Sequence, residues 1–137
     1  FFTKGENVKY YGYGPYESYS DKHLCTYIDE FNTTVSDMYE PYIKPQENGS
    51  HFGTRYVETE NIRVSSDTPF SFSALHYTQE ELTEKKHNFE LEKCDDTVLC
   101  IDYKQNGIGQ NSCGPLTQEE YRFDESEFEF KIRIEIK

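Results

Sequence analysis

The side chains that could carry out acid–base or nucleophilic chemistry are 26 acidic residues, four histidines and four cysteines, in 137 residues. Carboxylates are so numerous that spacing alone singles out no pair for general acid–base chemistry, and most should be solvated. None of the four histidines lies in a sequence context that is typical of a serine or cysteine nucleophile and its base. The four are His23, His51, His76 and His87. The residues themselves therefore indicate no catalytic group in this chain.

The cysteines favour free thiols over a disulfide scaffold or a metal site. Cys25, Cys94, Cys100 and Cys113 contain no Cys-x-x-Cys pair and are too few to cross-link a chain of this length. A zinc site built from His23, Cys25 and a distant pair matches no ligand spacing. We therefore expect a cytoplasmic protein with no metal in this segment.

The charge balance opposes anionic partners. Lys and Arg number 14 against 26 Asp and Glu, which gives a net charge of -12, so nucleic acid and membrane surfaces are excluded as partners. No apolar run approaches the roughly 20 residues of a membrane span. Residues 1–5 have neither a start methionine nor a signal-peptide pattern. We expect a fragment of a longer protein.

The elements that must position these side chains are mostly strands. With 12 Tyr and 10 Phe, the chain is rich in residues that suit pleated surfaces. Residues 127–137 alternate strictly, which predicts a strand with one buried and one solvated face; the expected buried face carries Phe128, Phe130, Ile132, Ile134 and Ile136. Further strands are predicted at residues 8–13, 53–64, 70–74 and 97–103, and long loops at Pro41 to Gly53 and Asn106 to Pro115. This pattern predicts a single all-β, antiparallel domain over residues 1–137.

One short surface helix is predicted after Thr78. Thr78 and Glu81 have the spacing of a capping box, and Glu81 and Lys85 are spaced to pair on one helix face. Leu82 is the only apolar residue inside the helix. Gly107-Ile108-Gly109 gives only a weak phosphate-loop signal, because polar residues rather than a helix follow it.

Several motifs follow one another across nearly the whole chain. Residues 12–19 read G-x-G-P-x-E-x-Y, and residues 36–49 read S-D-M-Y-x-P-Y-x-x-P-x-E-N-G. Further matches fall at residues 53–55, 70–73, 77–82, 101–102, 107–109 and 111–115. In this order the motifs resemble the last domain of family 2 β-galactosidases.

That resemblance implies a fold and a role. The fold would be an antiparallel β-sandwich, the C-terminal half of a galactose-mutarotase-like supersandwich. The parent enzymes are cytoplasmic, multi-domain homo-oligomers that hydrolyse terminal β-galactosides such as lactose with retention. Their two catalytic glutamates lie in a TIM-type barrel earlier in the chain, and their magnesium and sodium sites lie in other domains. The segment would buttress the barrel and be inactive alone.

The resemblance also implies a substrate-binding loop at Asn111, Ser112 and Cys113. Well-known members carry a tryptophan in a D-D-S-W-x-P context that stacks on the substrate at the mouth of the active site. Cys113 stands where that tryptophan would be, and a thiol offers no flat π face. We expect weaker stacking, or stacking by an aromatic side chain from elsewhere. The alternative is that Cys113 only fills a small buried space.

Other readings stay open. The aromatic content would also suit a stand-alone carbohydrate-binding module, and exposed sheet edges would suit a structural assembly piece. In the loop at residues 45–55, Glu47 and Asn48 are expected to hydrogen-bond within their own turn. Arg55 is expected to join two strands through a carboxylate.

Overall fold

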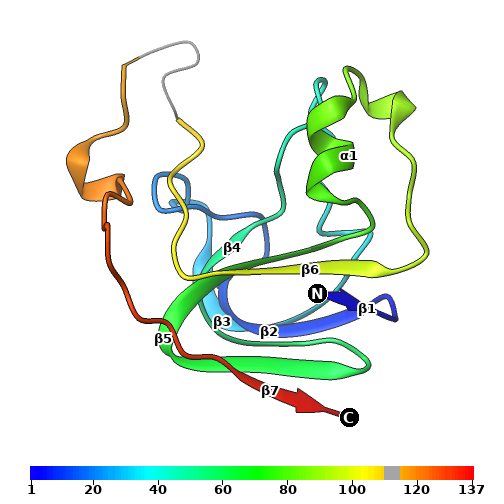
Figure 1. Cartoon of the computed structure of the whole chain (residues 1–137), viewed down its shortest axis with the longest axis horizontal. Helices are drawn as coiled ribbons and strands as arrows, with labels where there is room; N and C mark the ends of the chain where they lie inside the picture. Colours follow the sequence, from blue (N-terminus) through cyan, green and yellow to red (C-terminus); the bar gives the residue numbers. More distant parts are fainter. Residues whose placement is uncertain (110–114) are drawn as a thin grey trace.

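The computed structural model describes residues 1–109 and 115–137. The described residues form one antiparallel sheet of seven strands, with the order β1-β6-β5-β4-β2-β3 and β7 paired to β5 (Figure 1). The predicted all-β, antiparallel fold is confirmed, and the arrangement is consistent with a β-sandwich. The strands are β1 (Phe2–Thr3), β2 (Asn7–Gly14), β3 (Tyr27–Thr34), β4 (His51–Glu58), β5 (Ile62–Leu75), β6 (Thr97–Asp102) and β7 (Arg133–Ile136); the helix α1 spans Gln79–Glu84, and two 3-10 turns span Asn88–Glu90 and Glu119–Tyr121.

Strand β5 organises the sheet because it changes partners along its length. Its first residues pair with β7 and its last residues pair with β6, while β4 lies along its other side. Pro69 falls between the two pairings. A proline lacks the N–H that a ladder needs, so this position accepts it without losing a sheet hydrogen bond.

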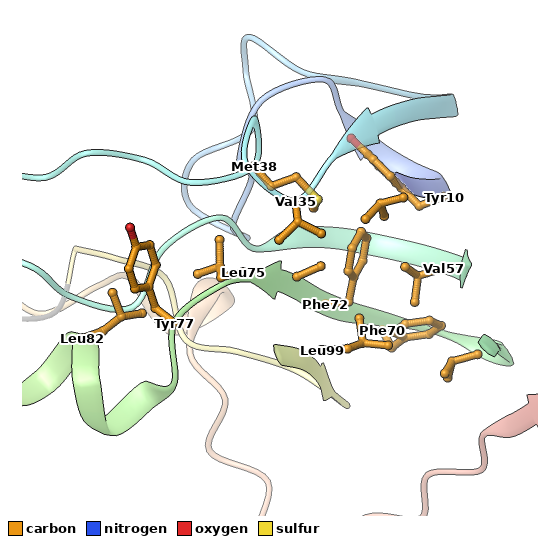
Figure 2. Close-up of a cluster of buried hydrophobic side chains, with 13 residues drawn as sticks. Tyr10, Val35, Met38, Val57, Phe70, Phe72, Leu75, Tyr77, Leu82 and Leu99 are labelled. Carbon is orange, nitrogen blue, oxygen red and sulfur yellow. The ribbon is translucent and has the colours of Figure 1, made fainter. Parts of the chain in front are cut away.

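The core lies on one side of the curved sheet, where side chains from β2, β4, β5 and β6 meet (Figure 2). Tyr10, Val57, Phe72 and Leu99 are fully buried. The rings of Tyr10 and Phe72 lie 5.1 Å apart between centroids and meet edge to face. The core therefore combines a few aromatic rings with a larger number of aliphatic side chains.

The strand predictions need correction at several positions. Residues 53–64 do not form one strand: β4 ends at Glu58 and β5 begins at Ile62, with a tight turn between them. The amide of Thr59 donates to the carbonyl of Ile62 at 2.8 Å and closes this turn. The two-residue edge strand β1 was not predicted, and neither was the edge strand β3. It pairs only with β2, so most of its side chains stay exposed and its sequence carries no apolar alternation.

The last strand is shorter and more exposed than its alternation predicts. Only Arg133–Ile136 pair with β5. Ile134 and Ile136, expected to be buried, are 44% and 85% exposed, because no further element of the described chain covers their face. Alternation marks an apolar face, but it does not supply a partner for that face.

The helix prediction is confirmed. The Thr78 hydroxyl accepts a hydrogen bond from the amide of Glu81 at 3.1 Å, and Lys85 pairs with Glu81 at 3.5 Å. Leu82 is fully buried and ties α1 to the core beside Tyr77 (Figure 2). Neither α1 nor any other helix in the described part of the chain has the length and apolar character needed to cross a bilayer.

Candidate functional site

The predicted substrate-binding residues Asn111, Ser112 and Cys113 lie outside the described residues. The structure does describe both flanks of this segment, residues 103–109 and 115–123. Their contacts show how the base of the loop is held.

The first flank is held by Asp21. Its carboxylate oxygens accept hydrogen bonds from the amides of Ile108, at 3.1 Å, and Gly109, at 3.0 Å. A Cβ atom at Gly107 would lie 2.0 Å from the Asp21 carboxyl carbon, so the approach requires glycine there. The glycine-rich stretch does form an anion cradle, but the bound anion is a carboxylate of the same chain.

A second anchor joins this flank to the loop before β4. The Gln105 amide nitrogen donates to Glu47 at 2.6 Å and to Asp102 at 3.0 Å. Burial and, to a smaller extent, the nearby Glu47 charge raise the pKa of Asp102, the Gln105 hydrogen bond lowers it, and the net pKa is about 6. Glu47 thus contacts a distant segment, and the prediction that it bonds within its own turn is wrong.

The second flank is held by aromatic packing. Phe128 stacks on Tyr103 at 4.6 Å between ring centroids, and Phe123 meets Tyr103 edge-on at 5.8 Å. The Phe123 amide donates to the Asn106 side chain at 2.6 Å. The second flank and the chain after it therefore pack against residues 103–106 of the first flank.

The turn that carries Asp21 is itself fixed by Glu17. This carboxylate accepts from Lys22 at 2.5 Å, from the Gly49 amide at 2.8 Å and from the Tyr42 hydroxyl. Burial pushes the pKa of Glu17 upward, but these three donors outweigh it and lower the pKa. Glu17 is thus an ionised, structural link between the 17–22 turn and the 42–49 loop. Its place in the G-x-G-P-x-E-x-Y motif was the only sequence signal.

A family model described as β-galactosidase small chain matches residues 2–134. The chain belongs to this family. It is 54% identical over 98% of its length to a β-galactosidase of Actinobacillus pleuropneumoniae, and 48% identical over 94% to one of Staphylococcus xylosus. Each alignment covers 13% of the relative, so this small-chain segment spans only a fraction of their length. The resemblance read from the motifs is confirmed.

The other matched loop of this β-galactosidase small-chain segment is structural. Asn48 accepts from the Glu40 amide at 3.0 Å and donates to the Gln46 carbonyl at 2.9 Å, which confirms that it bonds within its own loop. Arg55 does join β4 to β5, but its guanidinium donates to the backbone carbonyl of Asp67 and not to a carboxylate.

The geometry of the loop base supports presentation of a segment rather than acid–base work. The two carboxylates that meet there, Glu47 and Asp102, share one neutral amide donor. Over residues 1–109 and 115–137, no three His, Cys, Asp or Glu side chains gather so that they could hold a metal ion. The distinctive feature of this region is that both flanks of the loop are held, the first by Asp21 and the second by Asn106.

Proposed function

We propose that this chain is the C-terminal segment of a retaining, cytoplasmic β-galactosidase that hydrolyses terminal β-galactosides such as lactose. In this proposal the segment packs against the catalytic barrel, carries no catalytic glutamate and presents the 106–115 loop at the mouth of the active site. The family and the names of the relatives support the reaction. The free thiols of Cys25, Cys94 and Cys100 fit a reducing compartment.

The observation that carries the loop's role is its anchoring at both flanks. Asp21 holds Ile108 and Gly109, and Asn106 holds Phe123. Fixing both ends of a short segment lowers the entropy lost when its tip meets a ligand. Asn111, Ser112 and Cys113 are the proposed substrate contacts at that tip.

Exposed apolar side chains support the packing role. Ile134 and Ile136 of β7 and Phe2 of β1 lie open on the described surface. Apolar groups that a domain leaves uncovered mark surfaces for other domains or subunits. The proposal assigns them to the barrel and to a homo-oligomeric assembly.

The experiment that tests the loop's role compares the full-length enzyme with its Cys113→Trp and Cys113→Ala variants, on lactose and a nitrophenyl galactoside. An indole face at the mouth should lower KM about two- to tenfold, because aromatic stacking contributes about 0.5–1.5 kcal/mol. Cys113→Ala should change KM or kcat by a smaller factor.

The matched control is Cys25→Ala, which removes an exposed thiol on a different loop and should leave both constants unchanged. If all three variants keep wild-type kinetics and only the Cys113 variants shift the melting temperature, the loop is scaffold. The purified 137-residue chain should not cleave either substrate, and measurable turnover would contradict the assignment of catalysis to the barrel.

A further inference from the structure

The chain contains two Asn-Gly dipeptides, Asn48-Gly49 and Asn106-Gly107. An asparagine followed by a glycine is chemically reactive, because the backbone nitrogen of the glycine can attack the side-chain carbonyl of the asparagine and no Cβ atom hinders the approach. In a folded protein the rate depends on how firmly the structure holds the reacting groups. The two dipeptides differ in this respect.

The reacting groups of Asn48-Gly49 are all engaged. Asn48 is 1% exposed, its Nδ2 atom donates to the Gln46 carbonyl at 2.9 Å, and its Oδ1 atom accepts from the Glu40 amide at 3.0 Å. The attacking group, the Gly49 amide, donates to the Glu17 carboxylate at 2.8 Å. Reaction at this dipeptide therefore requires that several hydrogen bonds of a buried loop break first.

The reacting groups of Asn106-Gly107 are held less firmly. The Asn106 side chain is exposed on the first flank of the loop. Among residues 1–109 and 115–137, neither its Nδ2 atom nor the Gly107 amide has a hydrogen-bond partner. Its Oδ1 atom accepts from the Phe123 amide at 2.6 Å. A donor at this oxygen stabilises the negative charge that develops there when the carbonyl carbon is attacked.

We propose that Asn106 is a site of spontaneous deamidation, at which water converts the asparagine to a mixture of isoaspartate and aspartate. The Gly107 nitrogen loses its proton to a base from the solvent and forms a C–N bond to the side-chain carbonyl carbon of Asn106. The amide nitrogen takes up a proton and leaves as ammonia. Water then opens the cyclic succinimide at either of its carbonyl groups. One water is consumed, one ammonia is released, and nothing is oxidised or reduced.

The isoaspartate product would change the backbone of this flank. When water opens the ring at the backbone carbonyl, the chain continues through the former side chain and gains one carbon atom before Gly107. The flank has little room for this change, because a Cβ atom at Gly107 would already lie 2.0 Å from the Asp21 carboxyl carbon. Isoaspartate should therefore displace the amides of Ile108 and Gly109 from the Asp21 carboxylate.

The test follows both dipeptides in the full-length protein that contains this chain. The folded protein is incubated for several days at mildly alkaline pH and digested, and its peptides are identified by chromatography with mass spectrometry, which separates isoaspartate from aspartate. Asn106 should convert at least about tenfold faster than Asn48, because Asn48 must first lose its hydrogen bonds. In guanidinium chloride, which removes the fold, the two asparagines should convert at similar rates.

Asn106→Gln is the matched variant. Its amide still offers an acceptor for the Phe123 amide, but a glutamine must form a larger ring and reacts far more slowly, so no conversion is expected at this position. The measurement reads the chemical identity of the residue and is independent of the role proposed for Cys113. The proposal is overturned if Asn106 stays intact in the folded protein, if Asn48 converts as fast, or if aspartate forms without isoaspartate, which would mean direct hydrolysis without the ring.

Discussion

The solvent-facing side of the sheet and a cavity lined by Tyr19, Phe52 and Tyr103 beside the loop flanks both combine aromatic rings with polar groups. The two regions differ in how those polar groups are hydrogen-bonded. On the sheet face, the Tyr56 hydroxyl donates to Glu30, and the Arg63 guanidinium lies 4.0 Å from the centre of the Tyr56 ring. Arg63 also pairs with Glu58 at 2.8 Å. Every one of these polar groups has a partner within the chain.

Tyr19, Ser20 and Gln105, which lie around the cavity, each carry a buried polar atom that has no hydrogen-bond partner among residues 1–109 and 115–137. The number of aromatic rings therefore does not distinguish these two regions. The state of the hydrogen bonds does. The two regions should also respond to different conditions, since the cavity end contains groups that titrate in mild acid and the sheet face depends on pairs of permanent charges.

The largest expected effect is acid destabilisation through His51, whose neighbour Phe52 lines the cavity. Burial lowers the pKa of His51 to about 4 from 6.5, against the opposing influences of its hydrogen bond to Tyr13 and the Glu17 charge. The unfolded chain therefore takes up the proton first, and stability present above pH 6.5 is lost as the pH falls toward 4. The loss should reach about 3 kcal/mol.

Urea denaturation of the purified chain, followed by tyrosine fluorescence from pH 4 to 7, measures this loss. A His51→Leu variant should be less stable at pH 7, because the Tyr13 carbonyl loses its partner, but its stability should change less with pH. An unchanged slope in this variant would show that other groups cause the acid sensitivity.

The second effect comes from Asp102 and has the opposite sign. Because the folded pKa of about 6 exceeds the ordinary 3.8, the folded state holds the proton longer. The stability contribution is full below about pH 3.8 and is lost as the pH rises through 6. We expect about 1–2 kcal/mol after solvent screening.

Asp102→Asn should remove this contribution, so that stability rises more steeply with pH between 4 and 6 than in the wild type. The same titration of urea midpoints checks it. Asp124→Asn, at an exposed position near the loop, is the control and should reproduce the wild-type slope. A shallower slope in Asp102→Asn would contradict the sign.

The smallest effect is expected on the sheet face. Arg63→Ala should lose about 1 kcal/mol at low salt, from the contact with Tyr56 and the pair with Glu58. The loss should shrink in molar salt and stay constant between pH 5 and 7. Arg133→Ala removes an exposed arginine that makes no ion pair within the described residues and should change little. A pH-dependent loss in Arg63→Ala would erase the distinction between the two regions.

Short sequence patterns predicted correctly those elements that are determined by residues close together in the sequence. The Thr78 cap and the β-prone stretch at residues 8–13, which forms most of β2, depend on neighbours in the sequence. Strand β3 was missed because an edge strand with exposed side chains leaves no apolar period. The last strand was predicted too long, since its apolar face depends on a covering partner that no pattern reveals.

The candidate site was less predictable for the same reason. The family motif pointed to Cys113, but nothing around Tyr19 or Gln105 signals that these residues share a cavity. Gln105 meets Glu47 across 58 positions, and Asp21 meets Gly109 across 88. Such long-range contacts depend on the order and pairing of the strands, and short sequence motifs do not reveal these.

The edge pairing of β1 with β6 has a consequence for how the chain acquires this structure. The Thr97 hydroxyl donates to the Gly5 carbonyl 92 positions earlier, and the Ser66 hydroxyl reaches the Lys131 carbonyl across 65 positions. Contacts this distant require loop closure before they are stabilised, which places the chain among slow folders, on a scale of milliseconds to seconds. The pairing of β1 with β6 therefore cannot form until the segment up to β6 has been synthesised.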